Sequence, residues 1–115
     1  MDNVRAFGNA GDGIQVYADH SVLRDCVSAH NTRNGFTFAG NSENEPDTLI
    51  STKISGLTSY GNSGAALNMY LVHDSVLQGI TAMSCGSGIV ASDIRNSVLF
   101  NISSGNHTST ALGFF

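Results

Sequence analysis

Charge is scarce in this chain of 115 residues. Only 12% of the residues are charged, whereas an average soluble domain has about 25%. Lys and Glu together supply three residues, Lys53, Glu43 and Glu45. Because these residue types normally cover the exposed faces of helices, their scarcity argues against a helical bundle.

Proline and cysteine are also nearly missing. One Pro stands in a chain that is 41% hydrophobic, which argues against a Pro-rich disordered linker. Two cysteines, Cys26 and Cys85, do not make a disulfide framework. We expect Cys26 to be a buried, reduced thiol. Cys85 falls two repeats later, beyond the reach of a disulfide.

These absences limit the possible partners. Five Lys and Arg residues and a net charge of −4 do not suffice to neutralise a row of phosphates, so we expect no nucleic acid. No apolar run approaches the ~20 residues of a membrane span, so we expect no membrane partner. His30 and His107 are far apart without metal-ligand spacing, and we expect neither a metal nor another cofactor.

Small polar residues dominate instead, since Ser, Thr, Asn and Gly make up 47 of the 115 residues. They occur in a repeat of two alternating patterns. The first pattern occurs at 21–26, 52–57, 75–80 and 97–102, and the second at 13–16, 35–38, 64–67 and 88–91. Successive copies of one position lie 22, 31, 23 and 22 residues apart, at Val4, Cys26, Leu57, Ile80 and Ile102. The longer interval indicates an insertion at about 40–48.

One position of the first pattern is always Asp, Asn or Gly, the residue types that tolerate a left-handed backbone. We expect a corner there, at Asn3, Asp25, Gly56, Gly79 and Asn101. Three short strands and three turns per ~22 residues form one coil of a solenoid whose strands pair in parallel. An antiparallel sandwich would not require the same residue class at matching positions in four copies.

The repeat therefore predicts an all-β, single-stranded parallel β-helix of about five coils, a single domain over 1–115. Three interior columns are expected. They are Leu23, Ile54, Leu77 and Leu99; Cys26, Leu57, Ile80 and Ile102; and Ile14, Phe36, Ala65 and Ile89.

The repeated Ser-Val-Leu segments and the Asn-x-x-Gly-[Ile/Phe] segments, including 31–36, resemble the right-handed parallel β-helix of the pectate-lyase-like superfamily. That superfamily includes polysaccharide lyases, hydrolases, mannuronan epimerases and phage tailspikes. The resemblance implies the fold, a polysaccharide partner, and a location outside the cell or on a virion surface. A fold shared so widely implies no particular reaction.

Such folds work on the outer face of the strand that begins at the Gly. The exposed positions expected there are Gln15, Thr37, Ala66, Val90 and Leu112. They include no carboxylate, His or Arg, so the strip resembles a packing surface. Thr37-Phe38-Ala39 also departs from the acidic and His residues of the epimerases. Asp12, before Gly13, is interpreted as a turn residue.

Polar residues gather on the loops that follow these strands, and stacking brings the loops to one edge. Glu45, Asp47 and His73 are the candidate catalytic residues, because a carboxylate pair suits glycosidic cleavage and a His or Tyr base suits β-elimination. The candidate substrate-binding residues are Tyr17, Asp19, His20, Glu43, Tyr70, Asp74 and Arg95. A solvated loop is the competing interpretation.

The leading hypothesis is a carbohydrate-directed module, the polysaccharide-binding or structural segment of a tailspike-like or secreted polysaccharide-active protein. The alternatives are a polysaccharide lyase or glycoside hydrolase with its site on the 40–48 loop edge, and an oligomerisation stalk. Uncovered strand edges at both ends predict a homo-oligomer or the remainder of a longer chain.

Overall fold

A computed structural model describes residues 2–16, 21–39, 49–50, 53–92, 94–105, 107 and 112–114. These residues form strands and turns without a helix, and the strands stack in parallel as a β-solenoid of about four turns. The expected fold class is confirmed, whereas the expected number of coils, about five, is slightly too high. No helix long and apolar enough to span a membrane occurs in the described ranges.

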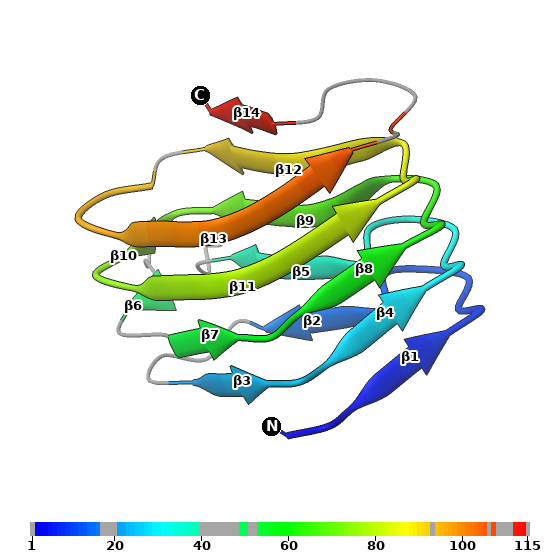
Figure 1. The fold of residues 1–115 in the computed structure, drawn as a ribbon, viewed down its shortest axis with the longest axis horizontal. Helices are drawn as coiled ribbons and strands as arrows, with labels where there is room; N and C mark the ends of the chain where they lie inside the picture. Colours follow the sequence, from blue (N-terminus) through cyan, green and yellow to red (C-terminus); the bar gives the residue numbers. More distant parts are fainter. Residues whose placement is uncertain are drawn as a thin grey trace, which may run out of the picture.

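Two long sheets and one short one build the solenoid (Figure 1). The larger sheet contains β1 (Arg5–Phe7), β3 (Val22–Arg24), β4 (Val27–Ala29), β7 (Lys53–Ser55), β8 (Thr58–Tyr60), β11 (Val76–Met83) and β13 (Val98–Gly105). The second contains β2 (Ile14–Val16), β5 (Phe36–Ala39), β9 (Ala65–Tyr70), β12 (Ser87–Ser92) and β14 (Leu112–Phe114). The short sheet pairs β6 (Leu49–Ile50) with β10 (Val72–His73).

Figure 1 shows the direction of winding. The strands of the larger sheet run left to right in front, and those of the second sheet run right to left behind, while the chain rises from N to C. The coil is therefore right-handed, the hand that crossover connections between parallel strands normally take.

The corners of the larger sheet lie where the sequence predicts them. The φ angle is positive at every expected position: Asn3 (59°), Asp25 (54°), Gly56 (68°), Gly79 (65°) and Asn101 (55°). At this corner one left-handed residue turns the chain in each coil, and in the last two coils it does so inside the continuous strands β11 and β13. The recurrence of Asp, Asn and Gly is thus a backbone requirement.

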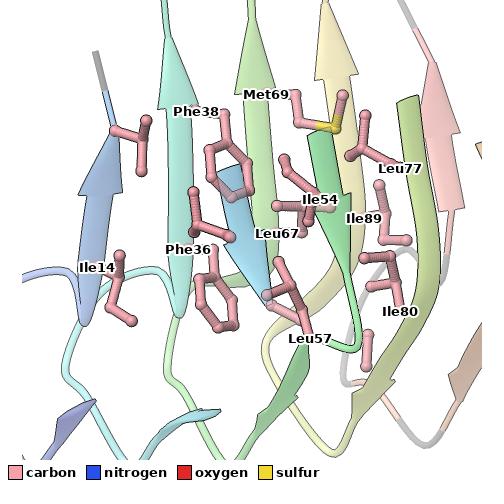
Figure 2. Close-up of a cluster of buried hydrophobic side chains, with 14 of the residues drawn as sticks. Ile14, Phe36, Phe38, Ile54, Leu57, Leu67, Met69, Leu77, Ile80 and Ile89 are labelled. Carbon is pink, nitrogen blue, oxygen red and sulfur yellow. The ribbon is translucent and has the colours of Figure 1, made fainter. Parts of the chain in front are cut away.

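Two of the three expected interior columns are confirmed. Leu77 is in register with Ile54 and Leu99, and Leu23 is in register with Ile54. Ile80 is in register with Ile102. Figure 2 shows interior side chains from both long sheets lying together in one core.

The third column contains Leu67 where Ala65 was expected. Phe36 pairs with both Ile14 and Leu67, and Leu67 pairs with Ile89. The predicted column is wrong by two residues at β9. Gly64 has the position in the sequence pattern that Gly13 and Gly35 have before their strands, so Ala65 was assigned to the interior. The chain instead places Ala66 in the position that Gly13 and Gly35 occupy in earlier coils. This also corrects the outer strip of the second sheet, whose paired positions are Gln15, Thr37, Asn68, Val90 and Gly113.

A buried polar ladder runs along the turn between the two long sheets. Oδ1 of Asn31 accepts a hydrogen bond from the backbone N–H of Asn9 (2.9 Å), and Oδ1 of Asn62 accepts one from that of Asn31 (2.9 Å). In the coils of Asn31 and Asn62 a Ser three residues earlier accepts from the Asn amide: Ser28 for Asn31 and Ser59 for Asn62, each at 2.9 Å. The Ser–Asn pair satisfies polar backbone groups that would otherwise be buried unpaired.

This ladder explains two glycines. A Cβ added to Gly13 would lie 1.9 Å from Oγ of Ser28, and one added to Gly35 would lie 2.0 Å from Oγ of Ser59. A methyl group does not fit beside the Ser hydroxyl. Where Ala66 takes the Gly position, the next coil carries Ala82 in place of the Ser.

The same coil carries Cys85 in place of the Asn, so the polar pair becomes an apolar pair. Cys85 is 2% exposed and both cysteines are free thiols, as expected for Cys26. In the next coil the pair is polar again, with a histidine in the Asn position. Nδ1 of His107 accepts a hydrogen bond from the backbone N–H of Cys85 (3.1 Å), which leaves the ring proton on Nε2, facing Ser104 at 2.9 Å.

Candidate functional site

Six residues of the site predicted on the loop edge lie outside the described residues: Tyr17, Asp19, His20, Glu43, Glu45 and Asp47. The insertion at 40–48 does too. Tyr70, His73, Asp74 and Arg95 are described, and the structure divides them into two groups.

His73, Asp74 and Arg95 lie together on the predicted edge. His73 forms a parallel bridge with Arg95, and the backbone N–H of Asp74 donates to the carbonyl of Arg95 (3.1 Å). The Asp74 carboxylate accepts from the side-chain amide of Asn96, and both residues have left-handed φ angles of 53° and 49°. Asp74 therefore stabilises a turn, which limits its availability to a substrate.

Tyr70 lies elsewhere, at the end of β9. Leu71, at φ 54°, turns the chain between Tyr70 and β10. The Tyr70 side chain is on the outer side of the second sheet, in register with Ala39 and Ser92, and the residue is 45% exposed. It belongs with the outward residues of that sheet.

These outward residues form a polar face, which we define as Asp12, Gln15, Thr37, Asn68 and Tyr70. Gln15, Thr37 and Asn68 are in register on three adjacent strands. Asn68 and Tyr70 alternate with buried Leu67 and Met69 along β9. The first three positions of the expected packing strip therefore carry two amides and a hydroxyl, and Val90 and Gly113 continue the strip.

Asp12 organises this face. Its carboxylate accepts hydrogen bonds from Nε2 of Gln15 (2.8 Å), from Oγ1 of Thr37 (2.8 Å) and from the backbone N–H of Asn34 (2.9 Å). The Asp12 side chain is 3% exposed, and the guanidinium of Arg33 lies 3.8 Å away. Thr37 is 7% exposed, so the expectation that it stands in solvent is wrong.

The surroundings of Asp12 keep it ionised. Burial raises its pKa, but the hydrogen bonds from Gln15, Asn34 and Thr37, together with the charge of Arg33, outweigh that effect and lower the pKa below its usual value. Arg33 is 70% exposed, so solvent screens its share of this stabilisation.

Asp12 is part of a second ladder and does not act as an isolated turn residue. Asn34 takes the same position in the next coil, where its Oδ1 accepts from the backbone N–H of Ala65 (2.9 Å). The sequence carries a signal for this ladder: Asp12 and Gln15 are three residues apart, as are Asn34 and Thr37, and the two pairs are 22 residues apart.

Hydrogen bonding is the chemistry that the described groups of this face offer. An ionised carboxylate is no general acid at neutral pH, and three donors already occupy most of its lone-pair positions, which makes Asp12 a poor base. Glycoside hydrolysis requires a pair of carboxylates, and the groups that contact Asp12 in the described chain are donors. Among the described residues, no three His, Cys, Asp or Glu side chains gather as metal ligands would.

A scan against protein-family models finds no match to this chain, and neither the search of curated proteins nor the search of solved structures finds one.

Proposed function

We propose that this chain is a carbohydrate-directed β-solenoid module that binds a polysaccharide and does not cleave it. The observation that carries the proposal is the polar face, where the side chains of Gln15, Asn68 and Tyr70 lie on the outer side of the second sheet beside the buried Asp12–Thr37 pair. A polysaccharide offers hydroxyl groups to bond with such amides and a sugar ring to stack on the tyrosine.

The polar face suits a sugar chain in two respects. Asp12 holds Gln15 in place, so that less side-chain freedom is lost when Gln15 hydrogen-bonds to a ligand. Tyr70, at 45% exposure, adds an aromatic ring with a hydroxyl group beside Asn68. Rings of this kind combine apolar contact area with a polar group.

Binding is favoured over cleavage by the state of the described carboxylates. Asp12 accepts three hydrogen bonds, and Asp74 accepts one from Asn96. Neither is arranged as an acid and base pair. The second candidate function, a lyase or hydrolase using Glu45, Asp47 and His73, rests on residues of which only His73 is described.

A binding experiment tests the proposal. We expect an alginate, pectate or capsular polysaccharide to bind the purified chain in isothermal titration calorimetry. Asn68→Ala and Tyr70→Ala should each weaken binding by roughly tenfold if each loses about 1.4 kcal/mol of contact. Thr81→Ala, which changes an exposed residue on β11 of the other long sheet, is the matched control and should bind as the parent does.

An activity screen on the same polysaccharides separates the two candidates. Release of unsaturated or reducing ends that is abolished by Glu45→Gln, Asp47→Asn or His73→Ala would establish the enzyme. Binding that survives those changes and is lost in Asn68→Ala would support the module. Equal binding by the parent and by Asn68→Ala would contradict the proposed face.

A further inference from the structure

The larger sheet has an outer surface quite unlike the polar face. Two outward columns run along it, and the register of β3, β7, β11 and β13 sets their members: Val22, Lys53, Val76 and Val98 in one, and Arg24, Ser55, Gln78 and Phe100 in the other. We call this surface the valine face. Figure 1 shows these four strands stacked along the solenoid axis.

The apolar residues of the valine face are unusually exposed. Val22, Val76, Val98 and Phe100 are 41%, 40%, 55% and 41% exposed, and they are four of the seven large exposed hydrophobic residues of the described chain. Single exposed residues of this kind are ordinary, but a group on one face is typical of an interaction surface. Aliphatic groups suit a polypeptide partner better than a sugar chain, which binds chiefly to aromatic and polar groups.

A groove of about 300 Å³ lies within this face, between Val22, Arg24, Lys53, Ser55, Val76 and Gln78. Its positive charge comes from Lys53. Arg24 is ion-paired with Asp2, at 3.0 Å from Nε to Oδ1, whereas no carboxylate of the described residues lies within ion-pair distance of Lys53. None of the eight outward positions carries a carboxylate, although the whole chain has a net charge of −4. The groove thus offers Lys53 as a partner for an acidic side chain.

The spacing of the columns indicates the shape of that partner. Successive strands are ~4.8 Å apart, so the first column places Lys53 midway between Val22 and Val76, which are ~10 Å apart. On a helix, residues i and i+7 are about 10.5 Å apart along the axis, with i+3 and i+4 between them. Side chains on one face of a strand recur at about 6.7 Å and do not match the columns.

From these observations we propose that the valine face binds an amphipathic α-helix of a partner protein, lying along the solenoid axis. Apolar side chains at i and i+7 contact Val22 and Val76, and an acidic residue at i+3 or i+4 pairs with Lys53. The surface belongs to a different sheet from the polar face, so this proposal stands independently of carbohydrate binding.

A synthetic helix tests the proposal. The probe is a 15-residue peptide with Leu at i and i+7 and Glu at i+3 and i+4, and the matched control peptide has Lys in place of both Glu residues. We expect the acidic probe to bind in fluorescence anisotropy, to gain helicity in circular dichroism, and to shift the methyl resonances of Val22 and Val76. The basic control should bind at least tenfold more weakly.

Charge reversal in the protein completes the test. Lys53→Glu should weaken the acidic probe at least tenfold and strengthen the basic one. Arg5→Glu makes the same change in net charge on β1, outside the groove, and should change either affinity less than twofold. Equal binding of the two peptides, or equal losses in the two variants, would overturn the proposal. A third outcome would also overturn the proposal. If polygalacturonate shifted the methyl resonances of Val22 and Val76 and the acidic probe did not, the groove would be assigned to an anionic glycan.

Discussion

Leu77 and Gln78 are neighbours in β11 with opposite surroundings, since Leu77 is fully buried and Gln78 is exposed. Leu77→Asp would bury a carboxylate among apolar side chains and should lower the free energy of unfolding by at least about 3 kcal/mol. Gln78→Asp should change it by less than about 0.5 kcal/mol. Urea unfolding of both variants measures the difference, and equal midpoints would show that the strand faces the other way.

Asp12 makes part of the stability dependent on pH. Because its pKa is lower in the folded chain than in the unfolded chain, its contribution is complete above the unfolded value of about 3.9 and is lost as the pH falls through the folded value. We expect the melting temperature of the Asp12→Asn variant to fall less between pH 7 and pH 2 than that of the parent, because the variant has no carboxylate to protonate at this position.

The neutral-pH behaviour of the same site serves as a control. Asn34 already fills the equivalent position in the next coil, so Asp12→Asn should cost less than about 1 kcal/mol at pH 7. Asp12→Ala leaves the donors from Gln15, Asn34 and Thr37 without their acceptor and should cost about 1–3 kcal/mol. A larger cost for the Asn variant than for the Ala variant would contradict the hydrogen-bonding role.

Single residues differ in how well their role can be predicted from sequence. Asp25 and Asn101 were predictable as corners because a left-handed backbone restricts residue type locally. Asp12 was not, because its role depends on Thr37 and Asn34 in the next coil. Contacts between coils become visible only when the register is known.

At the level of elements, the polar ladder changes its chemistry in one coil as a unit. Gly35 faces Ser59 and Asn62, whereas the following coil boundary combines Ala66 with Ala82 and Cys85. We expect the double variant Ala82→Ser with Cys85→Asn to lose about 1–3 kcal/mol, because the new hydroxyl would overlap the Ala66 methyl group. Adding Ala66→Gly should restore most of that loss in guanidinium unfolding.

The single change Ala66→Gly is the control for this cycle. Alone it opens a small cavity beside Ala82 and adds backbone freedom, so it should destabilise the chain by about 1 kcal/mol. A triple variant that is no more stable than the double variant would show that the three positions are not coupled.

The register of β9 shows where sequence-based prediction stops at this scale. Gly64 matches the Gly that precedes the equivalent strands, so the sequence pattern predicted the first interior residue of β9 two residues too early, at Ala65 instead of Leu67. The structure places Ala66 there because the neighbouring coil has no Ser hydroxyl to exclude a methyl group. Two of the columns were predicted correctly because Leu, Ile and Val at those positions have no rival alignment.

For the molecule as a whole, the exposed edges of the sheets favour self-association. Strand β13 pairs with β11 along one edge, and no described strand pairs with its other edge. An eight-residue strand at the end of the described sheet is a template on which another strand can pair. We therefore expect the purified chain to form a homo-oligomer, seen by light scattering as a mass above 12.0 kDa at tens of micromolar. A single 12.0 kDa species over that range would contradict the prediction.

Three of the four steps between coils are 22 or 23 residues long, so one coil is a nearly fixed length of sequence. Val76 and Val98 are paired and 22 residues apart, so deleting residues 76–97 would join Ser75 directly to Val98 and offer β13 to β7 in the register that β11 now has. Deleting one residue within a strand would instead turn every later side chain of that strand to the opposite face. Gain or loss of a whole coil therefore preserves the strand register and changes the length of the chain with little disruption of its packing. The surfaces on the two sheets lengthen or shorten with it.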